Sequence, residues 1–249
     1  MPQGVSVPAE GPDMSHGGDG GFMKIEFEDD DILVVYKEAG LPVQAGRTSR
    51  TDLVSMLKNY LHGKAPLEAE PYLGIIHRLD QPVEGLLLFA KNRKAAAQLS
   101  RQVSAKSDMQ KVYQAIVMLP DAAALAKAKN AQHRVVTLSD DLLRDYQTNM
   151  SSVVQPGTQD SKTAELTYRT LRIAQDGRTA LMEIHLHTGR HHQIRVQMAH
   201  AGMPLMGDRK YGPADPEYKG GLCLCAASVR FRHPSTGQKM QYSIVPSFI

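Results

Sequence analysis

Hydrophobic positions along the chain recur with the two-residue period of strands or the 3.6-residue period of helices. Strand-like runs fall within 23–37, as two strands around an acidic turn, and at 72–79, 86–91, 111–118, 163–173, 179–187, 222–232 and 239–245. Helix-like spacing marks 51–63, 94–106 and 191–200. Thr51 is a candidate cap of the first helix, and Gly63 a candidate end. Many strands with scattered single helices predict an α+β fold rather than a doubly wound α/β fold.

Two segments lack a clear period. Residues 1–21 contain six glycines among Ser, Pro and Asp, which predicts a flexible leader. The stretch 121–162 combines an Ala/Lys run with polar residues around Gln155-Pro156-Gly157, and we expect an irregular insertion there. The sequence therefore predicts a leader at 1–21 and one folded domain at 22–249.

The composition is that of an ordinary globular protein, with 42% hydrophobic and 22% charged residues over 249 positions. No apolar run approaches the ~20 residues of a membrane span, and the N-terminal residues lack the basic-then-apolar pattern of a secretion signal. We therefore predict a cytoplasmic protein without a membrane partner. The two cysteines, Cys223 and Cys225, form no Cys-x-x-Cys motif and are predicted to be buried and reduced.

Positive charge is concentrated rather than large. The formal net charge is only +3, but residues 91–114 hold six Lys or Arg against one acid, Asp108. Such a segment could follow a phosphate backbone, or it could be the solvated face of a helix. Charge alone leaves both interpretations open.

An acid in a turn is the first candidate for chemistry, in the stretch GIIHRLDQPVEG at 74–85. Asp80 follows a predicted strand and precedes Pro82 and Gly85, which would place its carboxylate at the rim of a sheet. There it could act as a base, a metal ligand or a nucleophile, or it could only cap the turn. Downstream, Arg195 lies on a predicted helix, from which its guanidinium could keep a carboxylate ionised.

A basic and aromatic pair and a group of histidines complete the candidates. Lys111 and Tyr113 share one face of a predicted strand. Lys111 could meet a phosphate there, and Tyr113 could stack on a base or fill the core. The five histidines between 185 and 200 match no metal motif, so we predict no metal. The sequence also lacks a GxGxxG fingerprint and a P-loop, and no nucleotide cofactor is expected.

Taken together, these stretches resemble the RluA-type pseudouridine synthases. The matching pieces are HRLD at 77–80, KNRKAA at 91–96, KVY at 111–113, TGRHHQIRVQMAHAGMPLMGDRKYG at 188–212 and LCLCAASVRFRHPSTG at 222–237. The likeness runs from about residue 24 to the end and is weakest at 121–162. Where the family continues HRLD with two residues and Thr-Ser-Gly, this chain has Val83-Glu84-Gly85. We expect the catalytic domain at 22–249 to stand alone, without the small S4-like RNA-binding module of many members.

The resemblance implies a pseudouridine synthase fold, with a mixed, mostly antiparallel sheet, flanking helices and a central cleft. It implies an isomerase that acts on a specific uridine of structured rRNA or tRNA without a cofactor, and we expect a monomer. By position it makes Asp80 the catalytic aspartate, Tyr113 the ring that stacks on the target base, and Arg195 the partner of the aspartate. The RNA-binding residues predicted with them are His77, Arg78, Lys111, Arg190, His192 and Gln193.

Two other functions stay open on the sequence alone. One is a non-catalytic RNA-binding protein on the same scaffold, and the other is a metal-dependent hydrolase that uses the histidines. The role of Asp80 is open as well. It could attack the ribose as a nucleophile, or it could act as a base that expels uracil through a glycal-like intermediate.

Overall fold

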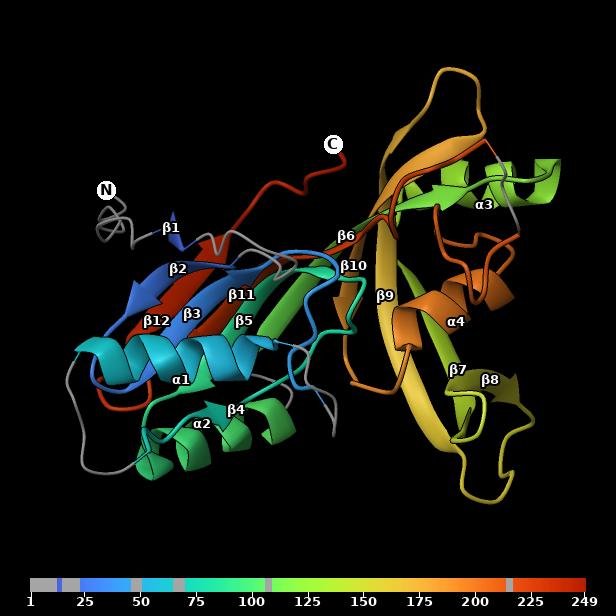
Figure 1. Ribbon diagram of the computed structural model, residues 1–249. Coiled ribbons are helices and arrows are strands. Elements are labelled where there is room, and N and C mark those ends of the chain that lie inside the picture. Colours follow the sequence, from blue (N-terminus) through green and yellow to red (C-terminus); the bar gives the residue numbers. More distant parts are fainter. Residues whose placement is uncertain (1–12, 15–22, 46–50, 65–69, 106–108, 214–216) are drawn as a thin grey trace, which may run out of the picture. The chain divides into compact units, whose positions relative to one another are not determined.

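The computed structural model describes residues 13–14, 23–45, 51–64, 70–105, 109–213 and 217–249, whose secondary structure is shown in Figure 1. The chain forms two compact units. Unit 1 comprises Met1–Met109 and Val229–Ile244, and unit 2 comprises Gln110–Ser228 and Val245–Ile249. Apart from residues 13–14, the predicted leader at 1–21 lies outside the described residues.

Unit 1 is built on a β-sheet. Its strands are β1 (Asp13–Met14), β2 (Met23–Glu28), β3 (Ile32–Lys37), β4 (Gly74–Ile75), β5 (Glu84–Ala90), the end of β11 (Leu224–Arg232) and β12 (Lys239–Ser243). Their order is β1-β2-β3-β5-β11, with β4 beside β5 and β12 beside β11. The pairs β1–β2, β2–β3, β3–β5 and β4–β5 are antiparallel. The two strands predicted within 23–37 are confirmed, whereas the strand predicted at 72–79 is wrong for all but the two residues of β4.

The two helices of unit 1 also match predicted segments. They are α1 (Leu53–Lys64) and α2 (Arg93–Ala105). Helix α1 is capped by Asp52 rather than by the predicted Thr51, because the Asp52 carboxylate accepts the N–H of Ser55 at 2.8 Å. In α2, Ala95 and Leu99 form the buried face.

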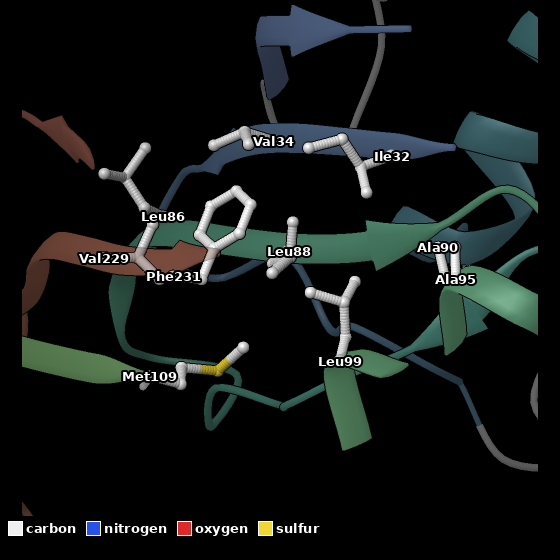
Figure 2. Packing of buried hydrophobic residues seen from close by; sticks show 10 residues of the cluster. All are labelled: Ile32, Val34, Leu86, Leu88, Ala90, Ala95, Leu99, Met109, Val229 and Phe231. Carbon is white, nitrogen blue, oxygen red and sulfur yellow. The ribbon is translucent and has the colours of Figure 1, made fainter. Parts of the chain in front are cut away.

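Strand β5 is the centre of the unit 1 core, and each of its seven residues is buried. On one face it packs with α2 and its neighbouring strands into the cluster of Figure 2, formed by Ile32, Val34, Leu86, Leu88, Ala90, Ala95, Leu99, Met109, Val229 and Phe231. Burial of each large apolar side chain contributes about 1.5–3 kcal/mol. This core fixes the strand that directly follows Asp80.

Unit 2 combines β-strands with two helices. Its strands are the start of β11, β6 (Gln110–Met118), β7 (Val136–Asp145), β8 (Met150–Val154), β9 (Lys162–Ile173) and β10 (Thr179–Leu186). Their order is β11-β6-β10-β9-β7-β8. The helices are α3 (Ala122–Ala131) and α4 (Gln193–His200). The pairs from β6 to β8 are antiparallel.

The irregular insertion predicted at 121–162 is wrong, because this stretch forms α3, β7 and β8. Alanine and lysine are strong helix formers, and Asp121 caps α3 by accepting the N–H of Ala124 at 2.7 Å. In β7 only Leu142 is fully buried, so the alternation that marks a strand is weak in the sequence. The turn to β8 includes Asn149 at φ 52°, a left-handed conformation that asparagine tolerates.

Strand β11 begins in unit 2 and ends in unit 1. Cys223, just before it, and Cys225, within it, are buried, as predicted. No helix among the described residues is both long enough and apolar enough to cross a membrane.

Candidate active site

Asp80 lies in a tight turn of unit 1, between β4 and β5. The N–H of Val83 donates to the carbonyl oxygen of Asp80 at 3.0 Å and closes the turn. Leu79 and Val83 are buried on either side, whereas Asp80 is half-buried. The buried Leu79 and Val83 therefore anchor the turn, while solvent can still reach the carboxylate of Asp80.

The two residues before Leu79 have different surroundings. Arg78 is exposed, so its guanidinium is accessible to an RNA phosphate. His77 accepts the backbone N–H of Leu88 on its Nε2 at 3.3 Å, which braces the segment against β5. Binding of RNA by either residue stays a prediction.

A buried lysine, which the sequence analysis missed, holds the Asp80 turn. The side chain of Lys37 is fully buried at the end of β3. Its Nζ donates to the carbonyl oxygens of Glu38 at 3.0 Å, Leu41 at 2.8 Å and Gln81 at 3.2 Å. The N–H of Gly40 also donates to the carbonyl of Gln81 at 2.8 Å. Lys37 thus ties the loop after β3 to the residue that follows Asp80.

Burial lowers the pKa of Lys37 to about 8, while the carboxylates of Asp80, Glu84 and Glu38 act to raise it. At neutral pH the ammonium form therefore predominates. Its attraction to Asp80 stabilises the ionised form of the carboxylate that a catalytic role requires.

In unit 2, Arg195 forms an ion pair with an acid that the sequence analysis did not single out. Its Nε lies 2.8 Å from Oδ2 of Asp208, and its Nη2 lies 2.7 Å from Oδ1. Oδ1 also accepts the backbone N–H groups of Lys210 and Tyr211. Burial alone would raise the pKa of Asp208, but Arg195 and these N–H groups outweigh it and leave the pKa below its usual value. The predicted pairing of Arg195 with Asp80 stays a prediction.

Tyr211 connects the start of α4 to β8. The backbone N–H of Ser151 donates to its hydroxyl at 2.8 Å, and the hydroxyl lies 2.8 Å from Nδ1 of His192. Burial, together with the charge of Arg195, lowers the pKa of His192 to about 3. His192 is therefore neutral, and the tautomer of its ring decides whether Nδ1 or the Tyr211 hydroxyl donates this hydrogen bond. The ring of His191 stacks on His192, with centroids 3.7 Å apart.

Gln193 and Arg190 organise the segment that enters α4. The Gln193 side chain is buried; its oxygen accepts from the Thr188 hydroxyl and the Arg190 N–H, and its nitrogen donates to the carbonyl of Glu165. The Arg190 side chain is exposed, and its Nε donates to the carbonyl of Thr163 at 2.9 Å. Among the predicted RNA-binding residues of this segment, Arg190 is the accessible one, whereas His192 and Gln193 are buried and make internal contacts. Their contact with RNA stays a prediction.

Lys111 and Tyr113 lie on β6, as predicted. Tyr113 is opposite Ile184 of β10 and is only 6% exposed. Lys111 is partly buried, and burial lowers its pKa. Stacking of a base on Tyr113 stays a prediction.

The structure brings together two groups of charged residues, one in each unit. In unit 1, Asp80 shares its electrostatic surroundings with Lys37 and Glu84. In unit 2, Arg195 and Asp208 form the buried ion pair. Within the described part of the chain, no group of three or more His, Cys, Asp or Glu side chains is placed to hold a metal ion. The half-buried carboxylate of Asp80, with the buried Lys37 acting on it, is suited to the role of a base or a nucleophile.

Comparison with known proteins identifies the family. The family model described as RNA pseudouridylate synthase matches residues 31–200. The chain is 33% identical to the uncharacterized RNA pseudouridine synthase YlyB of Bacillus subtilis, over 97% of this chain and 72% of that protein. It is 31% identical to the ribosomal large subunit pseudouridine synthase C of Buchnera aphidicola, over 87% of this chain and 65% of that protein.

A solved structure supports the same fold. Human RNA pseudouridylate synthase domain containing 4 superposes with a TM-score of 0.69 at 20% identity, covering 90% of this chain and 89% of that chain. The predicted α+β pseudouridine synthase fold is thereby confirmed. With a family match over most of its length, the chain belongs to the RNA pseudouridine synthase family and is an isomerase that acts on RNA.

Proposed function

We propose that this enzyme converts a uridine of large-subunit ribosomal RNA into pseudouridine and that Asp80 supplies the catalytic carboxylate. Support for the RNA class comes from relatives named ribosomal large subunit pseudouridine synthase C or D. Three of them, from Buchnera aphidicola, Vibrio cholerae and Nitrosomonas europaea, are 29–33% identical to this chain over 87–91% of its length. The observation that carries the role of Asp80 is its half-buried place in a turn held by Lys37.

The reaction breaks the bond between ribose C1′ and uracil N1 and forms a bond between C1′ and C5. The hydrogen on C5 leaves as a proton, N1 gains a proton, and no electrons are exchanged. Asp80 starts the reaction either by attacking C1′ or by removing a ribose proton, which gives the glycal-like intermediate. Both roles require an ionised carboxylate, which the neighbouring Lys37 ammonium favours.

The enzyme must also extract the target base from its stack. Stacking on Tyr113 would contribute about 1–3 kcal/mol, which is comparable with the few kcal/mol that unstacking costs. Contacts with phosphates must therefore supply the surplus, and the exposed Arg78 and Arg190 are suited to them. Binding should weaken as the salt concentration rises.

Loss of the C5 hydrogen provides the assay. Transcripts of large-subunit ribosomal RNA and of transfer RNA are made with uridine tritiated at C5, and release of tritium to water is measured. We expect release from the ribosomal transcript by the wild type and none by Asp80→Asn. Release from transfer RNA alone would overturn the proposed RNA class, and equal release by Asp80→Asn would overturn the role of Asp80. Mapping pseudouridine in cells with and without the gene then locates the modified position.

A further inference from the structure

Helix α2 has one face in the core of unit 1 and one face in solvent. Ala95 and Leu99 point into the cluster of Figure 2. The opposite face is exposed and holds three cations and three small side chains, which are Arg93, Lys94, Arg101, Ala97, Ser100 and Ser104. These six residues form the basic face of α2. The helix contains no Asp or Glu, so no acid of its own neutralises this face.

The cations of the basic face differ in their partners from those of α1. On α1, Lys58 and Lys64 each lie within 2.7 Å of a glutamate carboxylate. Within the described part of the chain, Arg93 and Arg101 form neither an ion pair nor a hydrogen bond through their guanidinium groups. Both groups therefore present their charge to solvent, which suits a polyanion as partner.

The first turn of α2 carries cations where a helix favours acids. The helix begins at Arg93, and Asn92 caps it by accepting the N–H of Ala95 at 2.8 Å. Arg93 and Lys94 follow the cap, where the helix dipole favours negative charge and disfavours positive charge. Lys94 acts on the nearby carboxylate of Asp31, which offsets part of this penalty. Stability of the helix therefore does not account for Arg93, whereas binding of an anion does.

An exposed aromatic side chain lies beside the basic face. Tyr72 is 41% exposed. A Cβ on Gly74 would lie 3.1 Å from the hydroxyl oxygen of Tyr72 and 3.1 Å from the Cβ of Ala96, so the tyrosine and α2 meet at this glycine. Ala96 is one helical turn from Arg93 and from Ser100, and Tyr72 therefore flanks the basic face. Cations next to an aromatic ring are the combination that binds the backbone and the bases of a nucleic-acid strand.

This surface is close to the proposed catalytic carboxylate. Gly74 belongs to β4, and Asp80 is six residues further along the chain, so their Cα atoms are at most about 22 Å apart. An RNA that presents a uridine to Asp80 therefore has neighbouring nucleotides within reach of α2. Arg93 and Arg101 are about 12 Å apart along the helix, a length over which a nucleic-acid strand presents several phosphates.

We propose that the basic face of α2 and Tyr72 form an RNA-binding surface outside the catalytic site. The cations bind backbone phosphates of the nucleotides that flank the target uridine, and Tyr72 stacks on an unpaired base among them. This inference rests on the proposed function, because the flanking nucleotides belong to the RNA whose uridine is isomerised at Asp80.

The first test measures binding of the large-subunit ribosomal RNA transcript at several salt concentrations. Arg93→Gln combined with Arg101→Gln should weaken binding about tenfold and lower the slope of log Kd against log salt by about 1.5–2, since each phosphate contact contributes about 0.7–0.9. KM should rise while kcat stays near the wild-type value. Arg93→Lys combined with Arg101→Lys keeps the charges and should retain the wild-type slope.

The matched control removes two charges from α1 instead. Lys58→Gln combined with Lys64→Gln changes the net charge by the same amount and should leave Kd and the salt slope nearly unchanged. Equal effects of the two double variants would overturn the proposal, because net charge alone would then explain the loss.

The second test sets stability against binding at one position. Arg93→Glu places an acid in the first turn of α2, so it should raise the midpoint of thermal unfolding slightly. It should also weaken RNA binding more than Arg93→Gln does. A gain in stability with unchanged RNA binding would show that the basic face is only solvated, and would overturn the proposal.

The third test concerns the tyrosine. Tyr72→Phe keeps the ring and should bind the transcript nearly as well as the wild type, whereas Tyr72→Ala should weaken binding about fivefold or more. Equal affinity of the two variants would overturn the proposed stacking.

Photocrosslinking locates the contact. Benzoylphenylalanine in place of Ala97, on the basic face, should crosslink to the transcript, and the same group in place of Asn59, exposed on α1, should not. No crosslink at position 97 with intact RNA binding would overturn the proposal. If the wild type releases no tritium from the transcript, the proposed function fails, and the affinities, salt slopes and crosslinks still decide whether α2 contacts RNA.

Discussion

Both units bury a cation, and they stabilise it in different ways. Lys37 in unit 1 donates to three backbone carbonyls at 2.8–3.2 Å. Arg195 in unit 2 forms a two-point ion pair with Asp208. The lysine can lose its proton near pH 8, whereas an arginine stays charged. The cation that can lose its proton, Lys37, therefore acts on the proposed catalytic carboxylate of Asp80. The permanently charged Arg195 stabilises the structure around α4.

The largest expected effect separates chemistry from scaffold in unit 1. Asp80→Asn should lower kcat by about 10³-fold or more, because an amide can neither attack the ribose nor accept its proton. Binding of RNA should stay within a few-fold, and the midpoint of urea unfolding should fall only slightly, because the half-buried side chain lies outside the core and Lys37 keeps its three backbone carbonyls. Tritium release, filter binding and urea titration measure the three quantities. A large loss of stability would show that Asp80 belongs to the scaffold after all.

In unit 2, replacing an aspartate by asparagine should instead lower the free energy of unfolding. Asp208→Asn leaves the guanidinium of Arg195 buried without its counter-charge, which costs about 3–5 kcal/mol. Urea unfolding of the variant measures the loss. Asp160→Asn, at an exposed acid between β8 and β9, is the matched control and should change stability little. Equal stability of the Asp208 variant and the control would contradict the scaffold role of the ion pair.

The dependence of stability on pH should differ between the buried Lys37 of unit 1 and the buried Arg195–Asp208 ion pair of unit 2. The pKa of Lys37 is about 8 in the folded protein, below its ordinary value of 10.5. Between these values the unfolded chain binds more protons, so stability should rise with pH across this window, by up to about 3 kcal/mol. Relief from burying a charge outweighs the one carbonyl contact that deprotonation releases. Urea titrations from pH 7 upward measure the rise, and in Lys37→Met it should be absent.

The pKa of Asp208 is shifted downward, so it has the opposite consequence in acid. Its contribution to stability is present above its ordinary value of 3.8 and is lost as the pH falls through the lower folded value. Comparing acid unfolding of the wild type with that of Asp208→Asn isolates this contribution. If stability fell equally in both proteins as the pH dropped from neutral, Asp208 would not be the source of this pH dependence.

The smallest expected effect concerns the contacts around α4. Tyr211→Phe removes the hydroxyl that accepts the Ser151 N–H and contacts His192. The variant should lose about 1–3 kcal/mol, because the N–H of Ser151 and the Nδ1 of His192 lose their common partner. Thermal unfolding provides the measurement. Tyr146→Phe, at an exposed tyrosine of the same unit, is the control, and a similar loss in both would remove the special role of Tyr211.

Much of the fold could be predicted from the sequence because the spacing of apolar residues along the chain matches the positions that are buried in the structure. Strand β5 is one continuous apolar run, and α2 has Ala95 and Leu99 four residues apart on its buried face. The stretch 121–162 could not be predicted in the same way. Helix α3 buries small alanines and so has no apolar stripe, and β7 has few fully buried positions.

The proposed site was predictable only as a set of motif residues. Asp80 and Arg195 stand in recognisable stretches, but their surroundings depend on residues distant in sequence. Asp208 reaches Arg195 from a loop 13 residues downstream, which no periodicity reveals. Lys37 ends an otherwise apolar strand, and an isolated lysine there gives no sign that its amine points into the core. Burial of Glu84 likewise follows from pairing of β3 with β5 rather than from local pattern.

The shared strand β11 has a consequence for synthesis on the ribosome. Unit 1 needs Val229–Ile244 as well as its N-terminal part, so the larger segment of unit 2, Gln110–Ser228, is inserted into it along the chain. The N-terminal segment of unit 1 therefore leaves the ribosome first but cannot complete its sheet. The edge of β5 stays unpaired until β11 has been synthesised, near the end of the chain. Unit 2 has most of its strands earlier and can assemble during this interval. A chain that ends after residue 228 and has been released from the ribosome should accordingly be sensitive to protease before residue 110 and more resistant after it.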